Sequence, residues 1–378
     1  MKQIRMNTLI TLIVAFIITI ALTFSACTTE KGKEPNAVKI GAILPLTGNL
    51  SFLGTPGKNA IELFKQQNKD NKAEIKLYDS KADPKTALTE FRRAYDFDNV
   101  RFFITTLTGV SLGVKPVAKD KRALQASIAI YPDIAAESDL AFQFCYNAIS
   151  EATAICSYIN DNAYQKIFVF ASRDAVTEVE LEKYILPSLK SAEVKCVVES
   201  FDVGTKDFKQ IVAKFKASDA SHAVLLGYGS DFQGILRELA NQKLIDQVKV
   251  IGGVGYLELP NYIEYSLVKN SVFVSPKFLT QENNNELYNK FKGAYQKVYG
   301  IVPTYDAAYT YDTITAISSA AKNVSSLSPE LVAEYLKKNT IPGVTGPIAF
   351  TSSGQLKVDV VMAKYNRDFS ILMSGEER

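Results

Sequence analysis

The chain has 378 residues, of which 47% are hydrophobic and 22% charged, and its formal net charge is +3. This length exceeds one ordinary hydrophobic core and suits two lobes, while the apolar share excludes a disordered chain. The charge is close to balance and no run of five basic residues occurs, which argues against nucleic acid as a partner.

The first 26 residues have the composition of a targeting segment. A basic head, "MKQIRMN", precedes the apolar run "LITLIVAFIITIAL" and then small residues before Cys27. The run is shorter than the ~20 residues of a membrane span. The segment resembles a bacterial lipoprotein signal, which implies cleavage before Cys27 and its lipidation. Phe24 departs from that pattern, so plain secretion and an uncleaved anchor are the alternatives. Residues 27–37 would form a polar tether.

Short β-rich runs then alternate with longer amphipathic segments. "VKIGAIL", "AEIKLYD", "VRFFITTL" and "RALQASI" are predicted to be buried parallel strands, with helix starts at Thr55 before Pro56 and at Asp83 before Pro84. The alternation continues with "KIFVFAS", "VKCVVESF", "HAVLLGYG" and "VKVIGGVG", separated by predicted helices over 177–192, 207–218 and 230–243. This order predicts two parallel sheets flanked by helices.

The end of the chain breaks the alternation. "SVFVSPKF" precedes three predicted helices, over 283–299, 304–323 and 328–339, and a strand pair is predicted around "GQLKVDVVMAKY". A chain that completes one lobe, builds another and returns to the first has this order. We therefore expect two discontinuous α/β lobes with a cleft between them. Residues 38–146 plus 278–343 would form the N-terminal lobe, and residues 147–277 plus 344–378 the C-terminal lobe.

The chemistry-bearing residues indicate no enzyme. Cys145, Cys156 and Cys196 are odd in number, so at least one thiol is free, and we expect buried free thiols. No Cys-x-x-Cys pair or histidine cluster suggests a metal site. The single histidine, His222, precedes a predicted strand and has no nucleophile or acid near it in sequence. We expect no catalytic residues, no metal and no cofactor.

Seven motifs carry a family resemblance from Val38 to about Tyr365. They are "VKIGAILPLTGNLSFLG", "YDSKADPKTALTEFRRA", "LTGVSLGVKPVAK", "GTKDFKQIVAKFKASDA", "GSDFQGILREL", "PTYDAAYTYDTITAISSAAK" and "GVTGPIAFTSSGQL". Each is weak alone, but in this order the chain resembles type I periplasmic binding proteins of the branched-chain amino acid transport group. The resemblance implies two Rossmann-like lobes with parallel sheets, joined by three crossover segments that close around a ligand. We place these near residues 144–149, 274–278 and 343–350.

Physical reasoning independently places a site in the cleft. Ligands of open parallel sheets bind beyond the carboxyl ends of the strands, where helix N-termini point their free N–H groups. Six loops follow predicted strands and should form the cleft wall: residues 47–53, 105–109, 128–131, 173–177, 227–230 and 252–255.

The resemblance also implies where an amino-acid ligand would be held. The serine that binds the ligand carboxylate in the family falls near Thr108, where a hydroxyl remains, although this loop looks one residue shorter. An aromatic residue of the first loop falls on Leu53, beside Phe52.

Other family positions have lost their polar groups. Small hydroxyl residues are replaced by Ile128 and Ile130, a tyrosine by Thr177, and the acid that pairs with the ammonium falls on or near Val254. Charge-assisted hydrogen bonds contribute about 1.5–3 kcal/mol each, and a micromolar complex has only about 8 kcal/mol in total. Unless other residues replace these contacts, free amino acids should not bind tightly.

The expected cleft therefore has an apolar wall, formed by Phe52, Leu53, Ile128, Ile130, Val254 and Tyr228. Thr108, the N–H groups around Gly109, and Arg173 remain to receive one anionic end. These residues predict a small, largely apolar or aromatic ligand, with a carboxylate as one option.

The resemblance implies an extracytoplasmic lipoprotein that delivers its ligand to an ABC permease, contacts the membrane through its N-terminal lipid only, and is a monomer. Three alternatives remain. They are a branched-chain or hydrophobic amino acid binder with relocated contacts, a sensory ligand-binding protein, and an envelope interaction protein without a small ligand.

Overall fold

The computed structural model describes residues 37–69, 73–259 and 263–374. The predicted signal segment, Cys27 and the tether as far as residue 36 lie outside the described residues. Within the described ranges, no helix combines the length and apolar character needed to cross a membrane.

The first sheet has five parallel strands, and its central strands are buried on both faces. Their order is β2 (Glu74–Asp79), β1 (Lys39–Leu44), β3 (Phe102–Thr106), β4 (Leu124–Ile128) and β5 (Ala141–Gln143). Alternate side chains of β1 enter different cores, with Ile40 and Ala42 on one face and Ile43 on the other. Helices must therefore cover both faces.

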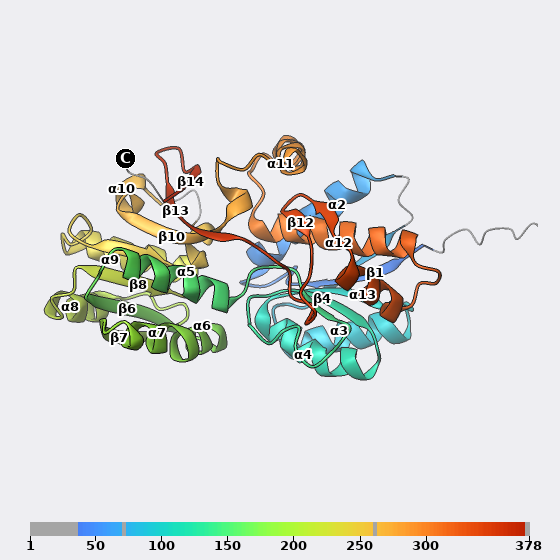
Figure 1. Cartoon of the computed structure of the whole chain (residues 1–378), viewed down its shortest axis with the longest axis horizontal. Coiled ribbons are helices and arrows are strands. Elements are labelled where there is room, and N and C mark those ends of the chain that lie inside the picture. Colours follow the sequence, from blue (N-terminus) through green and yellow to red (C-terminus); the bar gives the residue numbers. More distant parts are fainter. Residues whose placement is uncertain (1–36, 70–72, 260–262, 375–378) are drawn as a thin grey trace, which may run out of the picture. The chain divides into compact units, whose positions relative to one another are not determined.

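Helices cover both faces of this sheet, and α11 (Glu286–Tyr299) packs over α2 (Ser51–Gln67) (Figure 1). One face carries α2, α12 (Tyr305–Asn323) and α13 (Pro329–Lys338), and the other carries α3 (Pro84–Asp96) and α4 (Thr108–Asp120). Gly57 lets α2 approach α12 closely, because a Cβ atom there would lie 3.1 Å from the Thr310 Oγ1 atom.

One of the two predicted helix starts is confirmed. Asp83 accepts a hydrogen bond from the Thr86 N–H at 2.7 Å, with Pro84 at the first helical position of α3. The start predicted at Thr55 is wrong, because α2 begins at Ser51 and contains Pro56. The helix tolerates this proline near its start, where the only lost bond would be to the carbonyl of the exposed residue Phe52.

The second sheet has seven strands. Their order is β14 (Ile371–Met373), β13 (Val360–Tyr365), β10 (Ser271–Pro276), β9 (Lys249–Gly252), β8 (His222–Leu226), β6 (Lys166–Arg173) and β7 (Lys195–Asp202). The pairs from β10 to β7 are parallel, and β13 pairs antiparallel with both β10 and β14. The predicted strand pair at the end of the chain thus completes this sheet.

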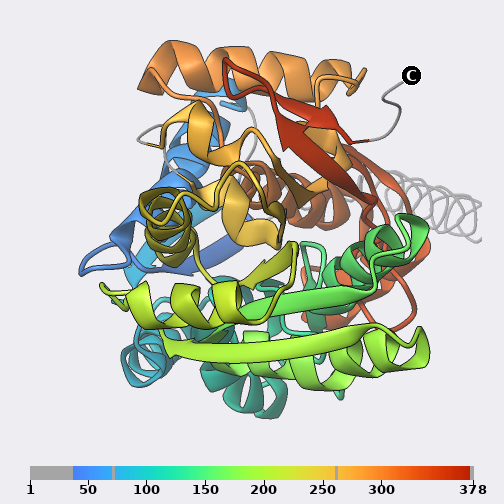
Figure 2. The same cartoon turned by 90° about the vertical axis from the view of Figure 1, so that its left-hand side faces the viewer.

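Helices cover both faces of the second sheet as well (Figure 2). One face carries α5 (Ala148–Asp161), α6 (Ala175–Glu180), the π turn η1 (Leu181–Ile185) and α7 (Leu186–Ser191). The other carries α8 (Lys209–Ala217), α9 (Gly229–Asn241), the 3₁₀ turn η2 (Val254–Glu258) and α10 (Tyr265–Val268). The single helix predicted over 177–192 is therefore interrupted by a π turn.

The chain after α13 packs on the first sheet for longer than the sequence indicates. The strands β11 (Ile341–Gly343) and β12 (Gly346–Ile348) form a hairpin. Phe350 then packs edge-on against Phe144 at 4.8 Å, and the Leu356 N–H donates to the Gln143 carbonyl at 2.9 Å. The lobe boundaries remain a prediction, and on this packing we propose that the last crossover lies between Leu356 and β13.

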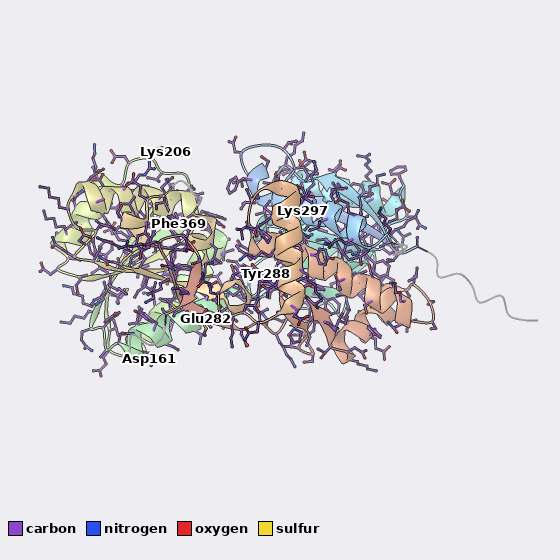
Figure 3. The ribbon with its side chains drawn as sticks, turned by 90° about the horizontal axis from the view of Figure 1, so that it is seen from above. Asp161, Lys206, Glu282, Tyr288, Lys297 and Phe369 are labelled. Carbon is purple, nitrogen blue, oxygen red and sulfur yellow. The ribbon has the colours of Figure 1, made fainter. Side chains whose placement is uncertain are left out.

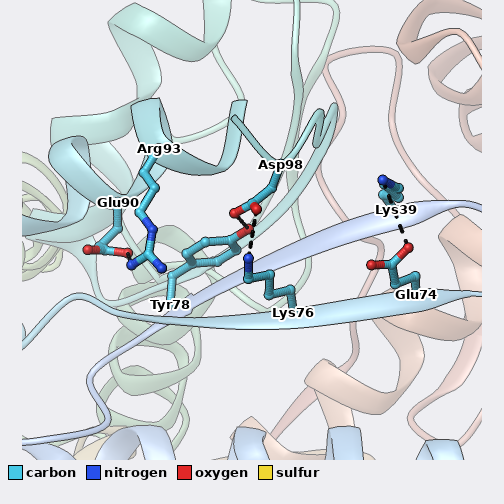
Figure 4. A network of polar contacts seen from close by, with 7 residues as sticks. All are labelled: Lys39, Glu74, Lys76, Tyr78, Glu90, Arg93 and Asp98. Carbon is cyan, nitrogen blue, oxygen red and sulfur yellow. Dashed lines mark hydrogen bonds and ion pairs between the residues drawn. The ribbon is translucent and has the colours of Figure 1, made fainter. Parts of the chain in front are cut away.

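The exposed surface carries balanced charges. Along the edge strand β2, the Lys76 ammonium lies 2.7 Å from the Asp98 carboxylate, which also accepts a hydrogen bond from Tyr78 (Figure 4). Asp161 and Lys297 are likewise exposed (Figure 3). Such surface pairs contribute little to stability.

The cysteines and the histidine have structural surroundings. Cys145 and Cys156 are buried free thiols, as predicted, and Cys196 is a partly buried one. The His222 ring stacks on the Tyr164 ring at 3.7 Å between centroids. Across the described ranges, no group of three or more histidine, cysteine or acidic residues is placed to hold a metal ion.

Candidate binding cleft

A cleft of about 800 Å³, counted with its open mouth, is lined by residues of both sheets and their helices. All six loops predicted as cleft wall contribute. The first wall, from the first sheet and its helices, consists of Leu53, Thr106, Leu107, Thr108, Ile128, Ala129, Ile130, Cys145, Tyr305 and Asp306. The second wall, from the second sheet and its helices, consists of Glu151, Asp174, Val176, Thr177, Glu180, Gly227, Tyr228, Val254 and Glu258.

The end of β4 and the loop after it bring Ile128 and Ile130 into the first wall, and the loop needs no polar turn residues. The Gln143 side chain donates one hydrogen bond to the Ala129 carbonyl and another to the Tyr131 carbonyl, at 2.5 and 3.0 Å. The Ala148 N–H satisfies the Ile130 carbonyl at 2.9 Å. Because residues from β5 and α5 donate hydrogen bonds to the carbonyl groups of this loop, the loop does not need polar side chains of its own.

The loop after β3 turns sharply at Leu107. This residue has a φ of 71°, a left-handed conformation that is uncommon for a residue other than glycine. Thr106 before it and Thr108 after it both line the cleft. The buried Thr106 Oγ1 atom has no hydrogen-bond partner among the described residues. The turn therefore offers polar groups to a solute.

Glu151 is a deeply buried carboxylate of the second wall. It lies on α5 and is 3% exposed. Its Oε1 atom accepts a hydrogen bond from the Val254 N–H at 2.9 Å, whereas its Oε2 atom has no partner among the described residues. Gly253 permits this approach, because a Cβ atom there would lie 2.1 Å from Oε1. Burial raises the pKa of Glu151 to about 7.

Glu180 and Asp174 belong to α6. Glu180 is 3% exposed and its Oε1 atom has no partner within the described ranges. Burial, and then the negative charge of Glu151, raise the pKa of Glu180. Asp174 caps α6 by accepting hydrogen bonds from the N–H groups of Val176 and Thr177 at 3.0 and 3.1 Å. Asp174 lies in the loop over residues 173–177 that was predicted to form part of the cleft wall.

Glu258 and Asp306 come from opposite walls. Glu258, on η2, accepts hydrogen bonds from the Gly229 N–H at 3.0 Å and from the Tyr305 hydroxyl at 3.5 Å. Burial raises the pKa of Glu258 to about 7. Burial, and then the charge of Glu258, raise the pKa of Asp306 to about 8. The two carboxylates are thus close enough to disfavour simultaneous ionisation.

The cleft is acidic. Five carboxylic acids line it, and none of the described lining residues is a lysine, arginine or histidine. No cation of the cleft wall itself therefore compensates these acids. The surface of β2 differs, because its acids face lysines.

Seven of the ten residues predicted to bind a ligand lie together in this cleft. They are Leu53, Thr108, Ile128, Ile130, Thr177, Tyr228 and Val254. Their contact with a ligand remains a prediction. Phe52 is 54% exposed and, like Gly109, is not part of the wall. Arg173 also lies outside it, and its guanidinium pairs with Asp202 at 2.8 Å. Of the groups expected to bind an anionic end of the ligand, only Thr108 and its loop line the cleft.

The sequence analysis missed Glu151, Glu180, Glu258 and Asp306 because it searched loops after strands. Three of the four lie on helices or a helix end, and Glu258 lies four residues beyond the predicted Val254. A signal was present in α5, where Glu151 shares the apolar face of Ala152 and Ile155. A second signal was "PTYDAAY", a motif of the family resemblance that contains Tyr305 and Asp306.

The sequence matches the family model described as "Periplasmic binding protein" over residues 37–369. The chain belongs to this family. The Leu/Ile/Val-binding protein homolog 1 of Brucella suis biovar 1 (strain 1330) is 24% identical over 87% of this chain and 91% of its own length. The leucine-, isoleucine-, valine-, threonine- and alanine-binding protein of Pseudomonas aeruginosa is 23% identical, over 88% and 91%.

Solved structures confirm the predicted type I periplasmic binding protein fold. A leucine binding protein from Thermotoga maritima superposes with a TM-score of 0.79 at 19% identity, covering 90% of this chain and 98% of its own. A solute binding protein from Rhodopseudomonas palustris BisB5, in complex with 3,4-dihydroxy benzoic acid, gives 0.79 at 18%, covering 89% and 95%. As a member of this family, the chain is an extracytoplasmic substrate-binding protein and not an enzyme.

Proposed function

We propose that this protein is the lipid-anchored, monomeric binding component of an ABC importer and holds a small solute with a largely apolar or aromatic body. The observation that carries the proposal is the apolar part of the cleft, where Leu53, Ile128 and Ile130 face Val254 from the opposite wall. Concave sites with apolar walls and a few polar groups are typical of small-molecule sites. Lipidation at Cys27 would keep the protein beside its permease.

Closure of the two lobes would trap the solute. A solute that contacts both walls stabilises the closed state by its differential affinity for that state. Tyr305 and Glu258 already meet across the cleft. The crossover segments would act as the hinge.

The structural neighbours support solutes of more than one kind. Two structures in complex with 3,4-dihydroxy benzoic acid and with benzoate share the fold with this chain, as does one in complex with isoleucine. A hydrophobic amino acid is the second candidate. It is favoured by Glu258, an acid in the cleft four residues from the position where the family's ammonium-binding acid falls.

The test is calorimetric titration and thermal unfolding of the full chain with a panel of hydrophobic solutes. At 100 times its Kd, a bound solute raises the free energy of unfolding by about 2.7 kcal/mol, and the Tm rises by several degrees. Ile130→Asp, which places a charge on the apolar wall, should weaken binding at least tenfold.

Ile149→Asp is the matched control, because Ile149 is an isoleucine that is 40% exposed at the start of α5 and does not line the cleft. It should bind as the unaltered protein does. Normal binding by Ile130→Asp, or no saturable binding of any solute, would contradict the proposal.

A further inference from the structure

The acids of the cleft are arranged as a chain of neighbours and not as scattered surface groups. Burial is the largest cause of the raised pKa values of Glu151, Asp306 and Glu180. The negative charge of Glu258 raises the pKa values of both Glu151 and Asp306 further, and the charge of Glu151 does the same to Glu180. With no base among the described lining residues, every ionised member increases the cost of ionising the next. A positive charge placed among them would remove this cost.

Buried oxygens in the cleft also lack hydrogen-bond donors. The Glu151 Oε2 and Glu180 Oε1 atoms are buried, belong to residues that are 3% exposed, and have no partner among the described residues. Buried polar atoms are normally paired, and a carboxylate oxygen can only accept. These two oxygens therefore call for a ligand that carries N–H or O–H donors.

The two carboxylates on opposite walls favour a ligand between them. Asp306 lies in the first turn of α12 and Glu258 at the end of η2. A cation between them converts a repulsion across the cleft into two attractions, one to each wall. Tyr228 and Tyr305 also line the cleft, and tyrosine rings attract cations at their faces.

We propose that the solute is a small hydrophobic amine, with a protonated nitrogen that donates N–H hydrogen bonds, an apolar body and no carboxylate. This inference rests on the proposed function. A zwitterion would bring one more carboxylate into the cleft, and a quaternary ammonium would bring charge without N–H donors. An amine supplies both the charge and the donors, and its apolar body packs against Ile128 and Ile130.

The test is isothermal titration calorimetry of the full chain at pH 7.5 with matched probes. Benzylamine, benzyl alcohol, benzoate and benzyltrimethylammonium share one body and differ in head group, and 3-methylbutylamine is leucine without its carboxylate. Benzylamine should bind at least tenfold tighter than the other three aromatic probes, and 3-methylbutylamine at least tenfold tighter than leucine. Benzoate or leucine binding as tightly as its amine partner, equal binding of benzyl alcohol, or binding of calcium chloride alone would overturn the inference.

Two isosteric variants locate the charge. Glu258→Gln and Glu151→Gln should each weaken benzylamine binding at least tenfold while leaving benzyl alcohol within twofold. Asp202→Asn is the control, because Asp202 is an exposed acid paired with Arg173 outside the cleft. Unchanged benzylamine affinity in both glutamine variants would overturn the inference.

A variant that fails to unfold cooperatively is replaced by Asp306→Asn, which removes an acid from the other wall. Failure of the proposed function is distinguishable from failure of this inference. If an anion, a zwitterion or a neutral probe binds as tightly as its amine partner, the solute-binding function stands and only the amine is overturned, whereas no binding by any probe overturns both.

Discussion

The first and second walls of the cleft are both built from strand ends and helix starts, but they use different chemistry. The first wall has the two isoleucines at and just after the end of β4, Leu53 of α2 and a single acid, Asp306. The second wall carries the other four acids. Both walls are built around parallel strands, so the fold does not decide which side chains each wall presents.

The difference assigns separate tasks to the two walls. Apolar side chains stabilise a complex in proportion to the area that they bury, and they distinguish weakly between solutes of different shape. Charged side chains distinguish solutes by the sign of their charge. We therefore expect changes in the second wall to alter which charge the solute carries, and changes in the first wall to alter how well its body fits.

The largest effect that we expect is a loss of stability as the pH rises. An acid whose pKa is higher in the folded state than in the unfolded state does not change the stability at a pH below its unfolded pKa. As the pH rises from there through the folded-state pKa, the unfolded state ionises more readily and the free energy of unfolding falls. For Glu151, a pKa raised from 4.5 to about 7 corresponds to about 3 kcal/mol. The free energy of unfolding, measured by urea titration, should thus fall by at least about 3 kcal/mol between pH 5 and pH 8.

The other titratable side chains that line the cleft with Glu151 are Cys145, Asp174, Glu180, Tyr228, Glu258, Tyr305 and Asp306. Glu258→Gln should flatten the pH curve, since it removes the shared neighbour of Glu151 and Asp306. Glu199→Gln, which removes an acid paired with Lys214 outside the cleft, should leave the curve unchanged. Asp312, whose pKa burial raises to about 6, titrates in the same window and is retained in both variants. A curve that rises with pH would contradict the assignment.

A smaller effect should follow from filling the space beside Glu151. In Gly253→Ala, the new methyl group would displace the Glu151 carboxylate from the Val254 N–H. A hydrogen bond to a charged group contributes about 1.5–3 kcal/mol, so the free energy of unfolding should fall by about 2 kcal/mol. Gly293→Ala in α11 is the control, because its added Cβ meets no atom within 4 Å and should stabilise the helix by up to about 1 kcal/mol. Equal values for the two variants would show that Glu151 is not held at Gly253.

The elements of the fold also differ in how well they could be predicted from the sequence. The strands were predictable because they are buried runs, and "KIFVFAS" is observed as β6 with Phe168 and Val169 on opposite faces. The break in the helix after β6 could not be predicted, because a π turn does not show in the spacing of apolar residues along the sequence. The start of α2 was mispredicted because Pro56 suits the first position of a helix, whereas the helix begins at Ser51, directly after the preceding turn.

The residues of the cleft, too, were predictable only in part. The loops of the first wall were predictable, since Ile128 is the last residue of β4 and loops after parallel strands meet at one edge of the sheet. The acids of the second wall could not be placed by that rule, because Glu151 and Glu180 reach the cleft through the packing of α5 and α6. Only tertiary structure brings their oxygens to the same space as Asp306, more than one hundred residues away in the sequence.

The smallest effect should come from trimming the first wall. Ile128→Val removes one methylene from a side chain that is 4% exposed and lines the cleft, so stability should fall by about 0.5–1.5 kcal/mol. Ile104→Val, in the neighbouring strand β3, should cost the same but lies outside the cleft. The benzylamine affinity, measured by calorimetry, should fall about fourfold in Ile128→Val, as expected for one buried methylene, and stay constant in Ile104→Val. The preference for benzylamine over benzoate should be unchanged in both, since neither variant alters an acid. A changed charge preference in Ile128→Val would mean that the first wall also selects the charge of the solute, and the division of tasks between the walls would fail.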